Sequence, residues 1–166
     1  MTGITRPTSN APAHYHARMQ LVFTKGAGKY DRMEVVRGDG AVERIDCPKQ
    51  RIIPHDMVHY AVESTLAKRG FLTRVREGAR ADFRMEPEAE SDAVERLVEV
   101  IQGDAWSGGN SAAEDVLDLY RVTCDERACP MLAVGEADIG AIRARIAELT
   151  AQWDALPVGQ SLALAM

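Results

Sequence analysis

Apolar and polar residues alternate along the stretch from residue 18 to residue 46. In 18–25 every second side chain is apolar, which is the period-2 pattern of a strand that buries one face. Further apolar residues lie in 31–37 and 41–46, and Gly38-Asp39-Gly40 joins these segments. An Asp-Gly pair between two such segments favours a hairpin because both residues tolerate positive φ. The three segments therefore predict an antiparallel meander.

The pattern changes to the helical period at Pro54. Pro54 suits the first turn of a helix and Gly70 suits its C-terminal stop, so the pattern predicts a helix over 54–69. The stretch 71–84 has few apolar anchors and predicts a short turn of helix or an irregular crossing. The apolar positions of the 54–69 helix form one continuous arc: Met57, Val58, Ala61, Val62, Thr65 and Leu66.

Two further helices follow from the same spacing. An acidic segment begins at Pro87 and ends before Gly103. The next helix begins with a capping box of Ser111 and Glu114 and stops near Pro130.

The C-terminal part of the chain predicts one more helix and a strand. The helix begins at about Asp138, and the alternating apolar residues of 162–166 predict a strand that returns to the meander. The helix carries a heptad stripe that suits packing on another helix or on a second copy of the chain: Ile139, Ile142, Ile146, Leu149, Trp153 and Leu156.

Together these elements define an α+β fold, in which an antiparallel sheet (the N-terminal three-strand meander plus the C-terminal strand) packs against about four helices. We interpret 18–166 as a single domain and 1–17, rich in Thr, Ser, Pro and Asn, as a flexible N-terminal arm. The expected core side chains are Leu21, Phe23, Val35, Met57, Val62, Leu66, Leu97, Ile101, Leu117, Ile142, Ile146 and Leu149.

Composition narrows the classes of partner. The 166 residues carry a formal net charge of −5, which argues against a dedicated nucleic-acid binder. The absence of a signal region and of a long apolar run argues against a membrane partner, and an odd number of cysteines suits a reducing compartment, so we expect a cytoplasmic protein. A basic run over 68–84 precedes an acidic run over 86–99. Such runs usually face solvent or each other, and the alternative is an anion-binding patch.

The candidate chemistry lies at the start of the 54–69 helix. If this helix includes His55, then His55 and His59 are one turn apart and project from one face, as a shared divalent metal or a proton-transfer pair requires. Glu63 one turn later, or Cys47 on the preceding loop, would supply a third ligand to zinc or another divalent metal. Asp56, beside the first histidine, is the candidate for proton transfer.

A structural interpretation competes with this one. The spacing is similar to the His-Glu-x-x-His pattern of zinc peptidases, but Asp56 is shorter than the glutamate and no third ligand follows by motif, so we do not carry peptidase activity over. Asp56 also suits the N-terminal dipole, and a histidine at the edge of an apolar arc often bonds a carbonyl or carboxylate. If Asp56 were the N-cap, His55 would lie outside the helix and the one-turn geometry would be lost.

The string Cys47-Pro-Lys-Gln-Arg-Ile-Ile-Pro-His-Asp-Met-Val-His-Tyr-Ala-Val-Glu63, followed by Gly70-Phe71, resembles the signature block of a family of small uncharacterised bacterial proteins. The likeness covers residues from about 20 to 80. It implies no activity and no cofactor, and it directs attention to the acids, histidines and thiol of the block.

Two functions remain as hypotheses. The first is a small cytosolic protein that binds an unidentified small molecule or protein partner at a site around 54–63. The alternative is a metal-dependent enzyme of the zinc type, such as a hydrolase, which uses the ligands named above and Asp56 in proton transfer. The stripe between Ile139 and Leu156 adds the prediction of a homodimer.

Overall fold

Four strands form one antiparallel sheet. The computed structural model describes residues 18–82 and 87–166, so the arm expected over 1–17 lies outside the described residues. The strands are β1 (Met19–Thr24), β2 (Tyr30–Arg37), β3 (Val42–Pro48) and β4 (Ser161–Ala165). Their order is β3-β2-β1-β4, with every neighbouring pair antiparallel. The meander and the return of the C-terminal strand to β1 are confirmed.

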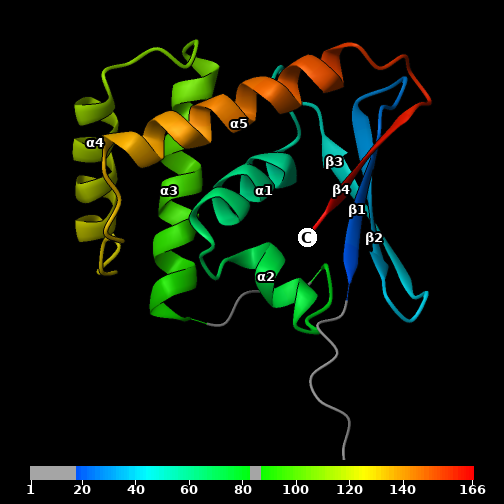
Figure 1. Cartoon of the computed structure of the whole chain (residues 1–166), viewed down its shortest axis with the longest axis horizontal. Coiled ribbons are helices and arrows are strands. Elements are labelled where there is room, and N and C mark those ends of the chain that lie inside the picture. The colour runs from blue at the N-terminus through cyan, green and yellow to red at the C-terminus, as the bar shows by residue number, and fades with distance from the viewer. Residues whose placement is uncertain (1–17, 83–86) are drawn as a thin grey trace, which may run out of the picture.

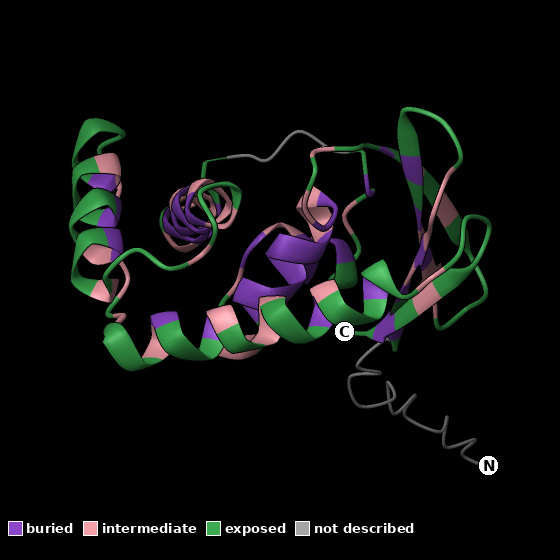
Figure 2. Ribbon diagram, turned by 90° about the horizontal axis from the view of Figure 1, so that it is seen from above, coloured by how far each residue is buried: buried purple, intermediate pink, exposed green. Residues whose placement is uncertain are grey.

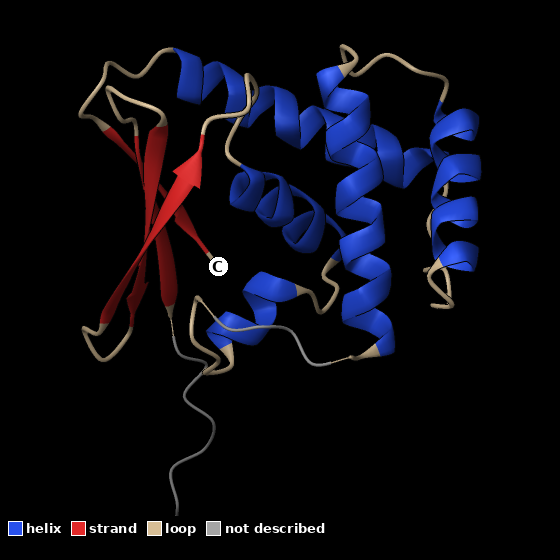
Figure 3. Cartoon of the chain, turned by 180° about the vertical axis from the view of Figure 1, so that it is seen from behind, coloured by secondary structure: helices blue, strands red, loops and turns tan. Residues whose placement is uncertain are grey.

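Alternation along β1 decides which face of the sheet is covered. Met19, Leu21 and Phe23 are buried, whereas the residues between them reach more solvent. Leu21 pairs with Val35 of β2 and with Leu164 of β4, so these side chains form one apolar row across the sheet. The helices all lie on one side of the sheet (Figures 1 and 3), and the α+β class is confirmed.

The described residues form five helices: α1 (His55–Leu66), α2 (Phe71–Arg76), α3 (Ala89–Trp106), α4 (Ala113–Glu126) and α5 (Glu136–Asp154). Helix α1 lies in the middle of the molecule, between the sheet, α3 and α5 (Figure 2). All of its residues from Met57 to Glu63 are buried. Because water does not reach this stretch, every polar side chain in it needs a partner within the protein.

One hydrophobic core joins the sheet to the helices. All the expected core side chains are buried except Leu66, Leu117 and Ile146, which are partly buried against the same core. Most of the α5 stripe also lies in this core, since α5 packs against α1 and α4. The stripe is therefore covered by its own chain, and the homodimer stays a prediction.

The end of α1 differs from the expected boundary. The helix ends at Leu66, because Ala67 adopts the left-handed conformation (φ 51°) and its N–H bonds the carbonyl of Glu63. Gly70 is not the stop of α1; it is the N-cap of α2. A Cβ at Gly70 would lie 2.6 Å from Cδ of Glu63 and 2.6 Å from Cγ1 of Val94, so close packing requires glycine there.

The predicted C-terminal end of α3 and the predicted N-terminal cap of α4 were wrong. Helix α3 continues past Gly103 to Trp106, because the last turn carries Asp104, a buried residue that pairs with Arg143. The capping box of Ser111 is absent, since the N-cap of α4 is Ala112 and makes no side-chain hydrogen bond.

Candidate metal centre

Helix α1 begins at His55 because Pro54 is its N-cap. The carbonyl of Pro54 accepts hydrogen bonds from the N–H groups of Met57 and Val58, at 2.9 and 3.2 Å. His55 and His59 are therefore both helical and one turn apart. Their rings meet edge to face, with centroids 4.8 Å apart and an angle of 85° between the planes. The one-turn geometry expected from the sequence is confirmed.

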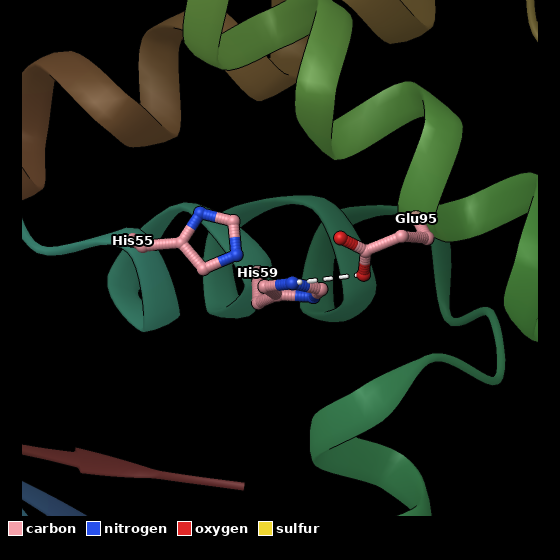
Figure 4. Close-up of side chains that lie close together, drawn as sticks. All are labelled: His55, His59 and Glu95. Carbon is pink, nitrogen blue, oxygen red and sulfur yellow. Dashed lines mark ion pairs between the residues drawn. The ribbon is translucent and has the colours of Figure 1, made fainter. Parts of the chain in front are cut away.

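Glu95 of α3 joins the two histidines. Its Oε2 lies 3.2 Å from Nε2 of His59, and one ligand atom each of His55, His59 and Glu95 lie within 4.8 Å of one another. Figure 4 shows the three side chains pointing toward one another, with one nitrogen of His55 and one oxygen of Glu95 on the inner side of the group. His59 is buried, whereas His55 and Glu95 are half-buried, so the group lies at the edge of the seam between α1 and α3.

Sequence reasoning missed Glu95, although a signal for it exists. Val98 and Gln102 lie three and seven residues after Glu95, so the three side chains share one face of α3. Val98 is fully buried and both polar residues are half-buried, which makes that face a border between core and solvent. His55 and His59, by contrast, were singled out by their one-turn spacing on α1.

Glu63 occupies a different environment from the one expected of a ligand. Its carboxylate accepts hydrogen bonds from the backbone N–H groups of Gly70, Leu72 and Thr73, at 2.9 to 3.1 Å, and from the hydroxyl of Thr73 at 2.9 Å. The side chain is fully buried. Since the first N–H groups of a helix lack partners within the helix, Glu63 acts as the cap of α2.

Both histidines have a hydrogen-bond partner at Nδ1. Nδ1 of His59 lies 3.3 Å from Oε2 of Glu63, and Nδ1 of His55 lies 2.7 Å from Oε1 of Gln102. The same amide oxygen accepts a hydrogen bond from Gln50. When Nδ1 of a neutral imidazole carries the proton and donates it to such an acceptor, Nε2 keeps its lone pair. Both rings are thus arranged with Nε2 as the nitrogen left for a ligand role.

The electrostatics of the seam depend on His59. Burial is the largest single influence and lowers the pKa of His59, but the hydrogen bonds and charges of Glu63 and Glu95 together outweigh it and raise the pKa to about 10. Burial is also the largest single influence on Glu95 and acts to raise its pKa, but the hydrogen bond from His59 and the charges of His59, His55 and Arg96 together outweigh it, so the pKa lies below its usual value. His59 without a metal is therefore an imidazolium between two carboxylates.

Cys47 and Asp56, the other residues singled out in the sequence, lie together at β3. Sγ of Cys47 is 3.9 Å from Oδ2 of Asp56, and neither residue belongs to the group of His55, His59 and Glu95. Burial, followed by the charges of Asp56 and Asp31, raises the pKa of the Cys47 thiol to about 12. Helix α1 thus presents Asp56 to Cys47 and the histidines to α3.

The two charge runs pair with each other in part. Lys68 lies 3.7 Å from Glu90, and Arg69 forms ion pairs with Glu88 and Glu77. These contacts agree with the expectation that basic and acidic runs face solvent or each other. The anion-binding alternative stays untested.

In comparisons with known proteins, no family model, no curated protein and no solved structure matches the chain. The resemblance of the block from Cys47 to Glu63 therefore stays an expectation. Among the described residues, no helix is both long enough and apolar enough to cross a membrane.

Proposed function

We propose that this protein binds one divalent transition-metal ion, of the zinc type, through His55, His59 and Glu95. The observation that carries the proposal is the convergence of two imidazoles and one carboxylate from α1 and α3, with one ligand atom of each within 4.8 Å of the others. Imidazole and carboxylate are ordinary zinc ligands. The metal ion would then be the ligand of the binding site that the sequence predicts around residues 54–63.

The spacing of the donors supports this proposal. With metal–ligand distances of about 2.0–2.1 Å, two ligands of one tetrahedral ion lie about 3.3 Å apart. Nε2 of His59 and Oε2 of Glu95 are 3.2 Å apart. The ligand atom of His55 lies no more than 4.8 Å from those of His59 and Glu95.

The surroundings of the ligands support it as well. Metal-binding histidines usually donate the second ring N–H to a carboxylate or carbonyl, which fixes the orientation of the ring. Glu63 provides this partner for His59, and Gln102 provides it for His55. Glu63 cannot move toward the ion without giving up its bonds to α2, so it serves as the orienting carboxylate.

Charge balance favours a divalent ion. Glu63 and Glu95 bring two negative charges into contact with His59. An imidazolium offsets one of these charges, whereas a divalent ion with two neutral imidazoles offsets both. A buried or half-buried cluster is most stable when its charges are compensated.

The test is metal content and zinc affinity of tag-free protein. The wild type is expected to take up about one equivalent of Zn²⁺, and Glu95→Gln to lower the affinity by about a hundredfold, because a neutral amide is a poor zinc ligand. Glu99→Gln is the matched control, since Glu99 lies one turn further along α3 with an exposed carboxylate, and it should leave the affinity unchanged.

Two outcomes contradict the proposal. One is a wild type that holds less than about a tenth of an equivalent of any transition metal and takes up none on addition of Zn²⁺. The other is equal loss of affinity in Glu95→Gln and Glu99→Gln. Either result would mean that the group is an ion-pair cluster that supports the packing of α1 on α3.

A metal-dependent hydrolase is the second candidate. Three protein ligands leave a fourth position for water, as in catalytic rather than structural zinc sites. The orientation of Asp56 toward Cys47 removes the proton acceptor expected from the sequence, so this candidate has less support than metal binding. Hydrolysis of an activated ester that requires Zn²⁺ and is lost in Glu95→Gln would support it. Ester hydrolysis that is equal in both proteins, or absent from the zinc-loaded wild type, would contradict it.

A further inference from the structure

A second candidate site lies on another face of α3. A cavity of about 440 Å³ opens between the end of α3 and the middle of α5. This volume is in the range of small-molecule sites in proteins, about 300–1,000 Å³. Its walls are mainly apolar, with Ile52, Ile101 and Ile146 among the lining side chains. Such walls suit an aliphatic or aromatic group.

One end of the cavity carries a fixed guanidinium group. Nε and Nη2 of Arg143 donate to the two carboxylate oxygens of Asp104, each at 2.9 Å, and Nη2 also donates to the carbonyl of Ser111 at 2.7 Å. The Asp104 side chain is only 5% exposed, so the buried carboxylate holds the arginine in place. A side chain that is already ordered loses less entropy when it binds a ligand.

The remaining donors of Arg143 are free. Within 18–82 and 87–166, Nη1 of Arg143 has no hydrogen-bond partner, whereas both oxygens of Asp104 are engaged. Arg143 therefore brings to the cavity wall a cation with two unused N–H donors, beside the Asp104 carboxylate, whose two oxygens already accept from Arg143. Donors of this kind select carboxylate or phosphate oxygens, and apolar walls beyond them select against a highly charged ligand.

The length of the cavity defines the ligand further. Thr150 lines the cavity seven residues after Arg143 on α5, which corresponds to about 10 Å along the helix axis. Ile146 and Ala147 lie between them. We propose that this cavity binds a monocarboxylate with a medium-length aliphatic tail, whose carboxylate meets Nη1 of Arg143 and whose tail lies along Ile146 toward Thr150.

The test uses octanoate and octan-1-ol as matched probes in calorimetric titrations of metal-free protein. Chelation of metal beforehand, with Glu95→Gln as a second control, keeps carboxylate binding at the candidate metal centre from being mistaken for binding in the cavity. Octanoate is expected to bind with a Kd of about 0.1–1 mM and octan-1-ol about tenfold more weakly, because the alcohol lacks the charge that strengthens the hydrogen bonds.

Two variants test the two halves of the proposal. Arg143→Met alone would leave the Asp104 carboxylate buried without a partner, so the double variant Asp104→Asn with Arg143→Met is used. The double variant should bind octanoate and octan-1-ol equally, with the affinity that the wild type has for octan-1-ol. Ala147→Trp, at an exposed position of α5 on the cavity rim, should block both probes while the protein stays folded by circular dichroism.

The proposal is overturned by any of three results. The wild type shows no saturable binding of octanoate up to about 5 mM; the double variant keeps its preference for octanoate; or Ala147→Trp binds octanoate as the wild type does.

Discussion

The two carboxylates that contact His59 belong to regions that are built differently. At the junction of α1 and α2, Glu63 is fully buried and accepts four hydrogen bonds from the chain besides its contact with His59. In the seam between α1 and α3, the Glu95 side chain is 21% exposed, and His59 is its ion-pair partner among the described residues. The two carboxylates lie on opposite nitrogens of one ring.

The difference separates a carboxylate that supports the fold from one that can bind an ion. A carboxylate offers about four lone-pair positions. Those of Glu63 are taken by donors of the chain, among them the backbone N–H groups of Gly70, Leu72 and Thr73. Glu95 keeps positions that no donor of the described chain occupies. The saturation of a buried acid by backbone donors is therefore a better guide to its role than its distance from a histidine.

The largest effect is expected from removal of Glu63. Glu63→Ala leaves three backbone N–H groups and Nδ1 of His59 without their acceptor, and the Thr73 hydroxyl keeps only the carbonyl of Lys68 at 3.3 Å. We expect the free energy of unfolding in urea to fall by about 3–5 kcal/mol, as when one partner of a buried charged network is removed. Glu95→Ala should cost about 1 kcal/mol, since its carboxylate has one charged partner and reaches solvent. Equal losses of unfolding free energy in Glu63→Ala and Glu95→Ala would contradict the view that Glu63 supports the fold and Glu95 does not.

Gly70→Ala probes the packing around Glu63. The new Cβ would meet Cδ of Glu63 and Cγ1 of Val94 at 2.6 Å, and neither atom is free to move away. We expect a loss of about 1–3 kcal/mol in the free energy of unfolding, as for other overpacked positions. Gly140→Ala is the matched control, because Gly140 is an exposed glycine of α5 with no atom within 4 Å of an added Cβ. It should stabilise the protein by about 0.5–1 kcal/mol. A neutral Gly70→Ala would show that the Glu63 region is not tightly packed.

Gln102→Leu tests the other region. Leucine keeps the size of the side chain but removes the acceptor of Nδ1 of His55, so the ring loses its fixed orientation. Zinc affinity should fall about tenfold, or about 1.4 kcal/mol, which is the usual effect of losing such a partner. Gln102→Glu keeps an acceptor and should restore the affinity in the same competition assay. If Gln102→Leu and the wild type bind zinc equally, His55 is not oriented by Gln102.

Local patterns predicted most of the elements but not their tertiary contacts. The alternation in β1 and the break at Gly38-Asp39-Gly40 predicted the meander, because β1, β2 and β3 pair with their neighbours in the chain. The α1 pattern also placed His55 and His59 correctly. Glu95 was missed because its role arises only when α3 packs on α1, and no local rule specifies which helices meet.

The contacts between Glu63 and Gly70 were missed for a related reason. Each residue was interpreted within its own helix, Glu63 as a ligand one turn after His59 and Gly70 as the stop of α1. In the structure the two residues belong together, since Gly70 makes room for the Glu63 side chain and donates its N–H to it. A glycine after a helix satisfies the rule for a C-terminal stop and the need for close packing equally well.

The smallest effect is expected at Cys47. This thiol was a candidate third ligand, but it lies beside Asp56 at β3 and outside the group formed with Glu95. A thiol must lose its proton to bind zinc, and burial together with two nearby acids holds its pKa at about 12. Cys47→Ser should therefore leave the zinc affinity at pH 7 within about twofold of the wild type, whatever it does to stability. A fall in zinc affinity of about tenfold or more would contradict this prediction and would mean that the thiol is a zinc ligand. The ion would then lie on the side of α1 that carries Asp56 and not on the side that carries the histidines.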